Sequence, residues 1–209
     1  MQRNRIPAGK SPAQKMAKNI SVFAFVMCLI VIGIIFVFSQ HKNGSETADD
    51  NALTTEVEKL AAKDLELGYP ATPTEVMKLF GRINQCMYNS TMDDEDFDKL
   101  LTQLRMLYST TLLDQNSFEE QKNDFKAEIE EFMNHKRRIA NYTVDKSSSV
   151  KYRTIDGKEC AFIQLEFFLS ENGKYSKSFQ DYILVKENDD WKILTFKKNI
   201  EEEKEKSES

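Results

Sequence analysis

The amino-acid sequence predicts an α+β protein: an N-terminal transmembrane helix, then three to four helices packed on one face of a curved antiparallel meander sheet. Three observations predict this class. An apolar segment lies near the start, capped segments with helical periodicity follow it, and alternating segments separated by hairpin turns occupy the last third. A chain of 209 residues and 24.2 kDa holds one domain with some excess, which argues against a two-domain enzyme.

The apolar segment covers residues 20–38 and contains no charged residue, Asn, Gln or Pro. As a helix it would be about 28 Å long, close to the hydrocarbon core of a bilayer at roughly 30 Å. Basic but no acidic residues precede it, so the positive-inside rule predicts a single-pass protein of the cell membrane, with residues 1–19 in the cytoplasm. A signal peptide cleaved near Ser39 is the alternative, although the apolar run is longer than such peptides usually have.

The remaining chain divides into a polar, flexible stalk over residues 39–53, an extracytoplasmic α+β domain over residues 54–199 and a charged tail over residues 200–209. After residue 19 the chain holds 24 Lys and Arg against 34 Asp and Glu, a formal charge of −10. So acidic a region is a poor partner for nucleic acid or anionic lipid.

Helix start signals recur through the first half of this domain. A helix is predicted over residues 55–67, because Thr55 and Glu58 have capping-box spacing. The strongest signal follows at Thr72, where Pro73 and Glu75 complete a capped start and an apolar stripe runs to about residue 89.

Two more helices are expected before the chain changes to strands. One begins near Thr91 with four acidic residues in its first turn, where they match the positive end of the helix dipole. Another begins at Ser117, has Glu120 in capping-box position and is predicted to run to about Ile139, with basic residues in its last turn.

Strands are predicted over residues 142–145, 150–155, 159–170, 175–187 and 191–197. The dipeptides Asp156-Gly157 and Asn172-Gly173 are strong signals for two-residue hairpin turns. Consecutive hairpins produce an antiparallel meander whose register the turns determine.

Period-two alternation then sorts the strand residues into two faces. The apolar face that the helices should cover comprises Val150, Tyr152, Ala161, Ile163, Leu165, Phe167, Tyr182, Leu184, Trp191 and Ile193. The second face mixes charges with large apolar groups, and we take it as the candidate interaction face: Phe162, Phe168, Phe179, Ile183, Val185, Leu194, Phe196, Lys151, Arg153, Glu166 and Asp181. Cover by the 55–67 helix or a loop, a partner or second copy, and a small-molecule pocket are the three explanations of such a face.

Three segments of the chain resemble segments of known proteins: TPTEVMKLFGRINQCMYN, the long helix followed by Tyr142-Thr143-Val144, and YILVKENDDWKIL. Together with the apolar segment before them, they resemble an uncharacterised family of single-pass membrane-anchored proteins from Gram-positive anaerobic bacteria, over most of residues 54–198. The helices followed by a curved meander also resemble the cystatin-like fold, including the nuclear transport factor 2-like superfamily. The resemblance implies location and architecture, and it assigns no activity.

Catalytic and metal-binding patterns were not found. The two histidines, His41 and His135, have no Cys or His neighbour at metal-ligand spacing, and no phosphate-binding or nucleophile motif occurs. We therefore expect no cofactor, no metal and no enzymatic activity. Cys86 and Cys160 lie on different predicted elements, which favours buried free thiols over a disulfide.

The sequence thus predicts a membrane-anchored interaction module outside the cytoplasm. Residues 20–38 would hold it in the membrane, and the folded domain would bind an envelope protein or itself as a homodimer. The alternative is a domain that binds a small apolar or peptide ligand in a pocket between the long helix and the sheet.

Overall fold

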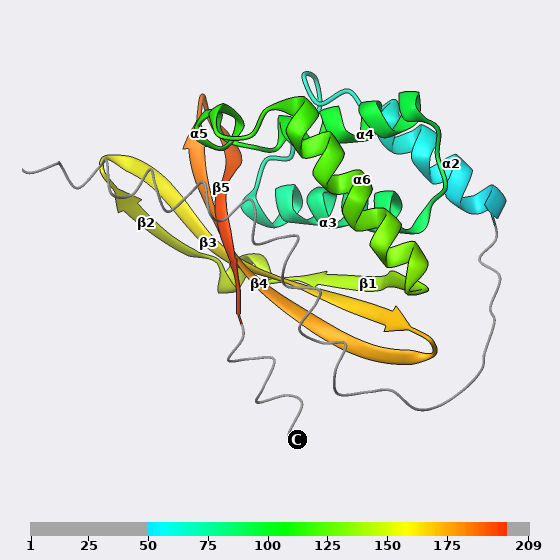
Figure 1. Ribbon diagram of the computed structural model, residues 1–209. Coiled ribbons are helices and arrows are strands. Elements are labelled where there is room, and N and C mark those ends of the chain that lie inside the picture. Colours follow the sequence, from blue (N-terminus) through cyan, green and yellow to red (C-terminus); the bar gives the residue numbers. More distant parts are fainter. Residues whose placement is uncertain (1–49, 200–209) are drawn as a thin grey trace, which may run out of the picture. The chain divides into compact units, whose positions relative to one another are not determined.

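The computed structural model describes residues 50–199, with side chains from residue 56 onward. Within them the chain is α+β, with helices gathered on one side of an antiparallel sheet (Figure 1). The helices are α2 (Asp50–Ala61), α3 (Pro73–Asn89), α4 (Asp94–Met106), α5 (Thr110–Asp114) and α6 (Phe118–Asn134). The strands are β1 (Arg137–Val144), β2 (Lys151–Ile155), β3 (Lys158–Glu171), β4 (Lys174–Glu187) and β5 (Asp190–Lys198), with a short 3-10 helix at Ser147–Ser149.

Helix α3 is the central helix, and its start is as predicted. The Glu75 amide donates to Thr72 Oγ1 at 3.3 Å and the Thr72 amide donates to Glu75 Oε2 at 3.1 Å, which completes the capping box. The apolar stripe of α3 is buried against the sheet, where Phe80 meets the ring of Tyr182 edge-on at 5.4 Å. This packing fixes which sheet face is internal.

The predicted fold class is wrong in its helix count. Five helices lie within residues 50–199 rather than three to four, because Ser109 caps the short helix α5, which the sequence did not predict. The predicted transmembrane helix over residues 20–38 lies outside the described residues. No helix within residues 50–199 is long and apolar enough to cross a membrane.

The sheet is also not a single meander. Strands β2 to β5 follow one another as hairpins, but β1 pairs with β3 on the edge that β2 also uses. Residues 158–162 of β3 pair with β2 and residues 165–171 pair with β1. The sequence shows the short strands but not that two of them share the edge of a longer one.

Helix α2 begins at Asp50, within the predicted stalk, rather than at Thr55, and two further helix boundaries differ from the prediction for local reasons. Helix α2 ends at Ala61 because the Asp64 carboxylate accepts the amides of Glu66 and Leu67, which closes a turn. Helix α6 ends at Asn134, because Lys136 has a φ of 52° and the following residues pair with β3. The basic residues expected in the last turn of α6 therefore belong to the chain reversal and to β1.

The hydrophobic core lies between α3 and the sheet face predicted to be covered. On that face Ala161, Leu165, Tyr182, Leu184 and Ile193 are at most 1% exposed, whereas Tyr152 is exposed. Helix α2 packs against α3 and α4, and α6 packs against α3 and β1. The suggested cover of the second face by the 55–67 helix is therefore not observed, because α2 lies with the other helices.

Candidate functional site

We define the outer face as the side of the sheet turned away from α3. The register between β3 and β4 is the predicted one, with Phe162 opposite Ile183 and Glu166 opposite Phe179. This pairing brings most of the predicted interaction residues onto the outer face: Phe162, Phe168, Phe179, Ile183, Val185, Lys151, Arg153, Glu166 and Asp181.

Leu194 and Phe196 do not follow the predicted alternation. A bulge places Leu194 as an extra residue of β5, since Leu184 pairs with Ile193 and Ile183 pairs with Thr195. Phe196 consequently pairs with Tyr182, and the two rings stack at 5.3 Å on the helix-covered side. The structure thus removes Phe196 from the outer face, where Thr195 and Lys197 stand instead.

Cationic side chains lie over the aromatic rings of the outer face. The guanidinium of Arg153 lies 5.6 Å from the ring centre of Phe162, and Lys177 Nζ lies 4.5 Å from that of Phe168. Lys177 also pairs with Glu166 at 2.7 Å, while Thr143 donates a hydrogen bond to the same carboxylate. The aliphatic stems of these cations shield part of the apolar surface from water.

A second polar group occupies the end of the face near Asn199. Asp181 accepts hydrogen bonds from Gln164 Nε2 at 3.1 Å and Asn199 Nδ2 at 3.3 Å, and Lys197 Nζ lies 3.8 Å from it. Glu166 and Asp181 each have basic or amide partners. The paired-carboxylate arrangement needed for acid/base chemistry is therefore not formed here.

Burial on the outer face is uneven. Phe179 and Val185 are buried, at 1% and 2% exposure, whereas Phe162, Phe168 and Ile183 are half-buried. Large exposed apolar groups occur instead near the two ends of the face, at Ile155 in β2 and at Tyr175 beside the β3–β4 turn. The outer face is thus a mixed surface rather than the continuous apolar cluster that alternation alone suggests.

Sequence reasoning found Lys151 and Arg153 but missed several other outer-face cations. The register also places Arg138, Lys158, Lys177 and Lys197 on this face, opposite Ser170, Ile155, Phe168 and Asp181. Extending the same alternation to the strand ends identifies Lys158 and Lys177. Arg138 and Lys197 require knowledge of where β1 begins and where β5 bulges.

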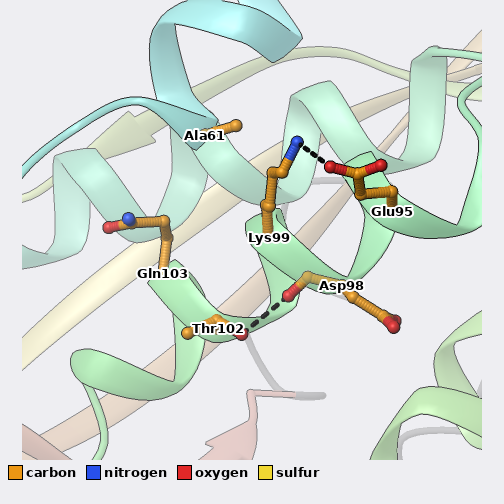
Figure 2. Close-up of a pocket in the computed structure, with 6 residues that line it drawn as sticks. All are labelled: Ala61, Glu95, Asp98, Lys99, Thr102 and Gln103. Carbon is orange, nitrogen blue, oxygen red and sulfur yellow. Dashed lines mark hydrogen bonds and ion pairs between the residues drawn. The ribbon is translucent and has the colours of Figure 1, made fainter.

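A shallow depression of about 330 Å³ lies between α2 and α4 (Figure 2). All but one of the residues that line it are polar or charged: Ala61, Glu95, Asp98, Lys99, Thr102 and Gln103. Figure 2 shows the Lys99 amine directed to Glu95, and the Thr102 hydroxyl donates to the Asp98 carbonyl oxygen at 2.7 Å. The depression is formed by α2 and α4, and not by α6 and the sheet, where the alternative interpretation expected a ligand pocket.

A partly buried carboxyl group lies where α6 meets α3 and β1. Glu128 lies on α6 between Phe125 and Phe132 in the sequence, and the ring centres of these two residues lie 6.1 and 4.7 Å from that of Tyr88. Burial raises the pKa of Glu128 to about 7, although the Tyr88 hydroxyl and nearby Arg137 favour its ionised form. Arg137 also pairs with Glu171 at 2.7 Å, so its positive charge is shared between two carboxyl groups.

Both described cysteines, Cys86 and Cys160, are buried free thiols, as predicted. Burial raises the pKa of each thiol, which lowers its fraction of reactive thiolate. Among residues 50–199, no group of three or more His, Cys, Asp or Glu side chains is placed to hold a metal ion.

Comparison with known families gave one match. Residues 10–196 match the family model described as Domain of unknown function (DUF6715). No curated protein and no solved structure matches the chain.

Proposed function

The chain belongs to the DUF6715 family, and from that premise we propose that it is a membrane-anchored interaction module, which binds an envelope protein or itself outside the cytoplasm. The outer face of the sheet carries this proposal, because α3 packs on the opposite face and the rings of the outer face lie under cationic side chains. An apolar centre with a polar border is a common arrangement for a protein interface. The role is binding rather than catalysis.

The proposed location is supported by the sequence. Residues 20–38 are wholly apolar, basic residues precede them and acidic residues predominate after them. We also propose, from the resemblance stated above, that the protein is one of the membrane-anchored proteins of Gram-positive anaerobic bacteria. The cystatin-like resemblance is supported by the packing of α3 across an antiparallel sheet.

Protease treatment of intact cells tests the location. We expect the domain after residue 39 to be digested while residues 1–19 remain protected. Digestion of residues 1–19 alone would contradict the proposal, and the mass of the membrane-bound protein shows whether the chain is cleaved near Ser39.

Site-specific photo-cross-linking of the full chain in cells tests the interaction. A photoreactive phenylalanine analogue at Tyr175, an exposed position on the outer face, should give a discrete protein adduct. The matched control is the same analogue at Leu67, which is 89% exposed in the connection between α2 and α3. An adduct of twice the mass identifies a second copy, and equal adducts at both positions would contradict an interface on the outer face.

A further inference from the structure

Charge is distributed unevenly over the described domain. Residues 50–199 hold 27 Asp and Glu against 21 Lys and Arg, a formal charge of −6. The outer face has the opposite balance, since only Glu166 and Asp181 accompany its cations over most of its length: Arg138, Lys151, Arg153, Lys158, Lys177 and Lys197. At the β4–β5 turn, Glu187 and Asp190 are already held by Thr110 and Lys192.

Most of these cations have no carboxylate partner within residues 50–199. Lys177 and Lys197 pair with Glu166 and Asp181, whereas Lys151, Lys158, Arg138 and Arg153 form no ion pair with a described residue. Lys151, Arg153 and Lys158 are also exposed. Their charges are therefore available to an incoming anion at little desolvation cost.

The shape of this basic surface is long and narrow. It follows β3, whose 14 residues extend about 46 Å at roughly 3.3 Å per residue. Exposed Ile155 and Tyr175 lie near its two ends, so the cations stand between two apolar groups. An extended chain of about a dozen residues has the matching length.

We propose, resting on the interaction role above, that the outer face binds an extended acidic polypeptide segment of a partner protein. Carboxylates of the segment pair with the outer-face cations, and apolar side chains near its ends contact Ile155 and Tyr175. A broad anionic surface, such as an anionic membrane, matches the outer face less well than a narrow segment does. The acidic parts of the domain around this face would repel such a surface wherever it came within the Debye length of about 8 Å. A second copy placed face to face would oppose two basic surfaces across the dimer axis.

The test measures peptide binding to the full chain held in nanodiscs of zwitterionic lipid. The probe is a peptide of about twelve residues that alternates Glu and Ser, and its neutral counterpart has Gln in place of Glu. We expect the acidic peptide to bind, the neutral peptide to bind at least about tenfold more weakly, and the acidic peptide to be released by added salt.

The variant K151E/R153E should weaken acidic-peptide binding by about tenfold or more, since it reverses two exposed charges. The matched control K59E/K78E makes the same charge change at exposed positions of α2 and α3 and should leave binding within about twofold. A melting curve for each variant shows whether it is folded. If K151E/R153E is unfolded, the inference is tested instead by the release of the acidic peptide in added salt and by the weaker binding of the neutral peptide.

Three outcomes would overturn the inference: equal binding of both peptides, equal loss in both variants, or binding of phosphatidylglycerol vesicles that K151E/R153E abolishes while neither peptide binds. The photo-cross-linking result separates this failure from that of the proposed function. An adduct at Tyr175 without peptide binding leaves the interaction role intact, whereas the absence of both removes it.

Discussion

The two faces of the sheet are shielded from water in different ways. On the helix-covered face, α3 buries Val76, Phe80, Ile83 and Met87 against strand residues that are almost inaccessible. On the outer face, half-buried rings lie beneath charged side chains that themselves remain in water. The first arrangement depends on close packing and the second on long amphipathic side chains, so the same substitution should have different consequences on the two faces.

The largest expected difference is between L184D and I183D. Leu184 is fully buried on the helix-covered face, so an aspartate there leaves a charge among apolar groups and should lower the free energy of unfolding by more than about 4 kcal/mol. Ile183 is half-buried on the outer face, so its aspartate variant should lose less than about 2 kcal/mol. Urea denaturation measures both, and equal losses would mean that Ile183 is internal core.

The pH dependence of the free energy of unfolding tests the burial of Glu128, which lies where α6 meets the helix-covered side. The pKa of Glu128 is raised to about 7 from 4.5, so the folded state holds this proton more tightly than the unfolded state. Its contribution to stability is complete below pH 4.5 and is lost as pH rises through 7, a decrease of up to about 3 kcal/mol. The groups that face Glu128 are Tyr88 of α3, Arg137 of β1, and Asp124 and Glu131 of α6.

The variant E128Q should abolish this part of the pH dependence, because a neutral amide occupies the site at every pH. The control E130Q removes an exposed carboxylate of the same helix and should leave the slope in place. Urea denaturation between pH 4.5 and pH 8 provides the comparison, and a slope unchanged in E128Q would contradict the role given to this carboxyl group.

A glycine tests the closeness of packing on the helix-covered side. A Cβ atom at Gly81 would lie 2.6 Å from Tyr142 Cδ2, so α3 and β1 approach too closely there for any larger residue. We expect G81A to cost about 1–3 kcal/mol in thermal or urea unfolding. The double variant G81A/Y142A should lose less than the sum of the single variants, and simple additivity would show that the two residues do not press on each other.

The smallest effect is expected on the outer face. K177A removes an ion pair with Glu166 and the cation over Phe168, both at a partly exposed position, and should cost less than about 1 kcal/mol. The part of this loss that comes from the ion pair with Glu166 should be smaller in 1 M NaCl, because salt screens the attraction. A loss above about 2 kcal/mol would mean that the outer face is part of the core.

Local patterns in the sequence predict much of this fold. The capping box at Thr72 gives the start of α3, and Asn172-Gly173 gives the β3–β4 register to the residue. The α6–β1 boundary is different, because Ile139 fits both a helical stripe and a strand alternation, and only pairing with Leu169 decides between them. The shared edge of β3 likewise depends on contacts between segments that no local pattern encodes.

The candidate site was predictable to the same extent. Strand alternation finds Phe162, Phe168, Ile183 and Arg153, whose pairing follows from the two hairpin turns. It fails at Phe196 because a bulge changes which residues of β5 share a face. It also fails to give the burial of Phe179, since alternation assigns a side to each residue but not the extent of its cover.

The bulge at Leu194 limits how this strand can change during evolution. Before it, residues of β5 alternate in one phase, and after it they alternate in the other, so one extra residue determines the side on which Phe196 lies. Regular pairing of β5 with Leu194 retained would turn Thr195 and Lys197 toward the core and Phe196 toward water. A descendant that loses the bulge but keeps all its residues must therefore also exchange the polarity of every later position in the strand, whereas deletion of Leu194 would leave those positions on their present faces.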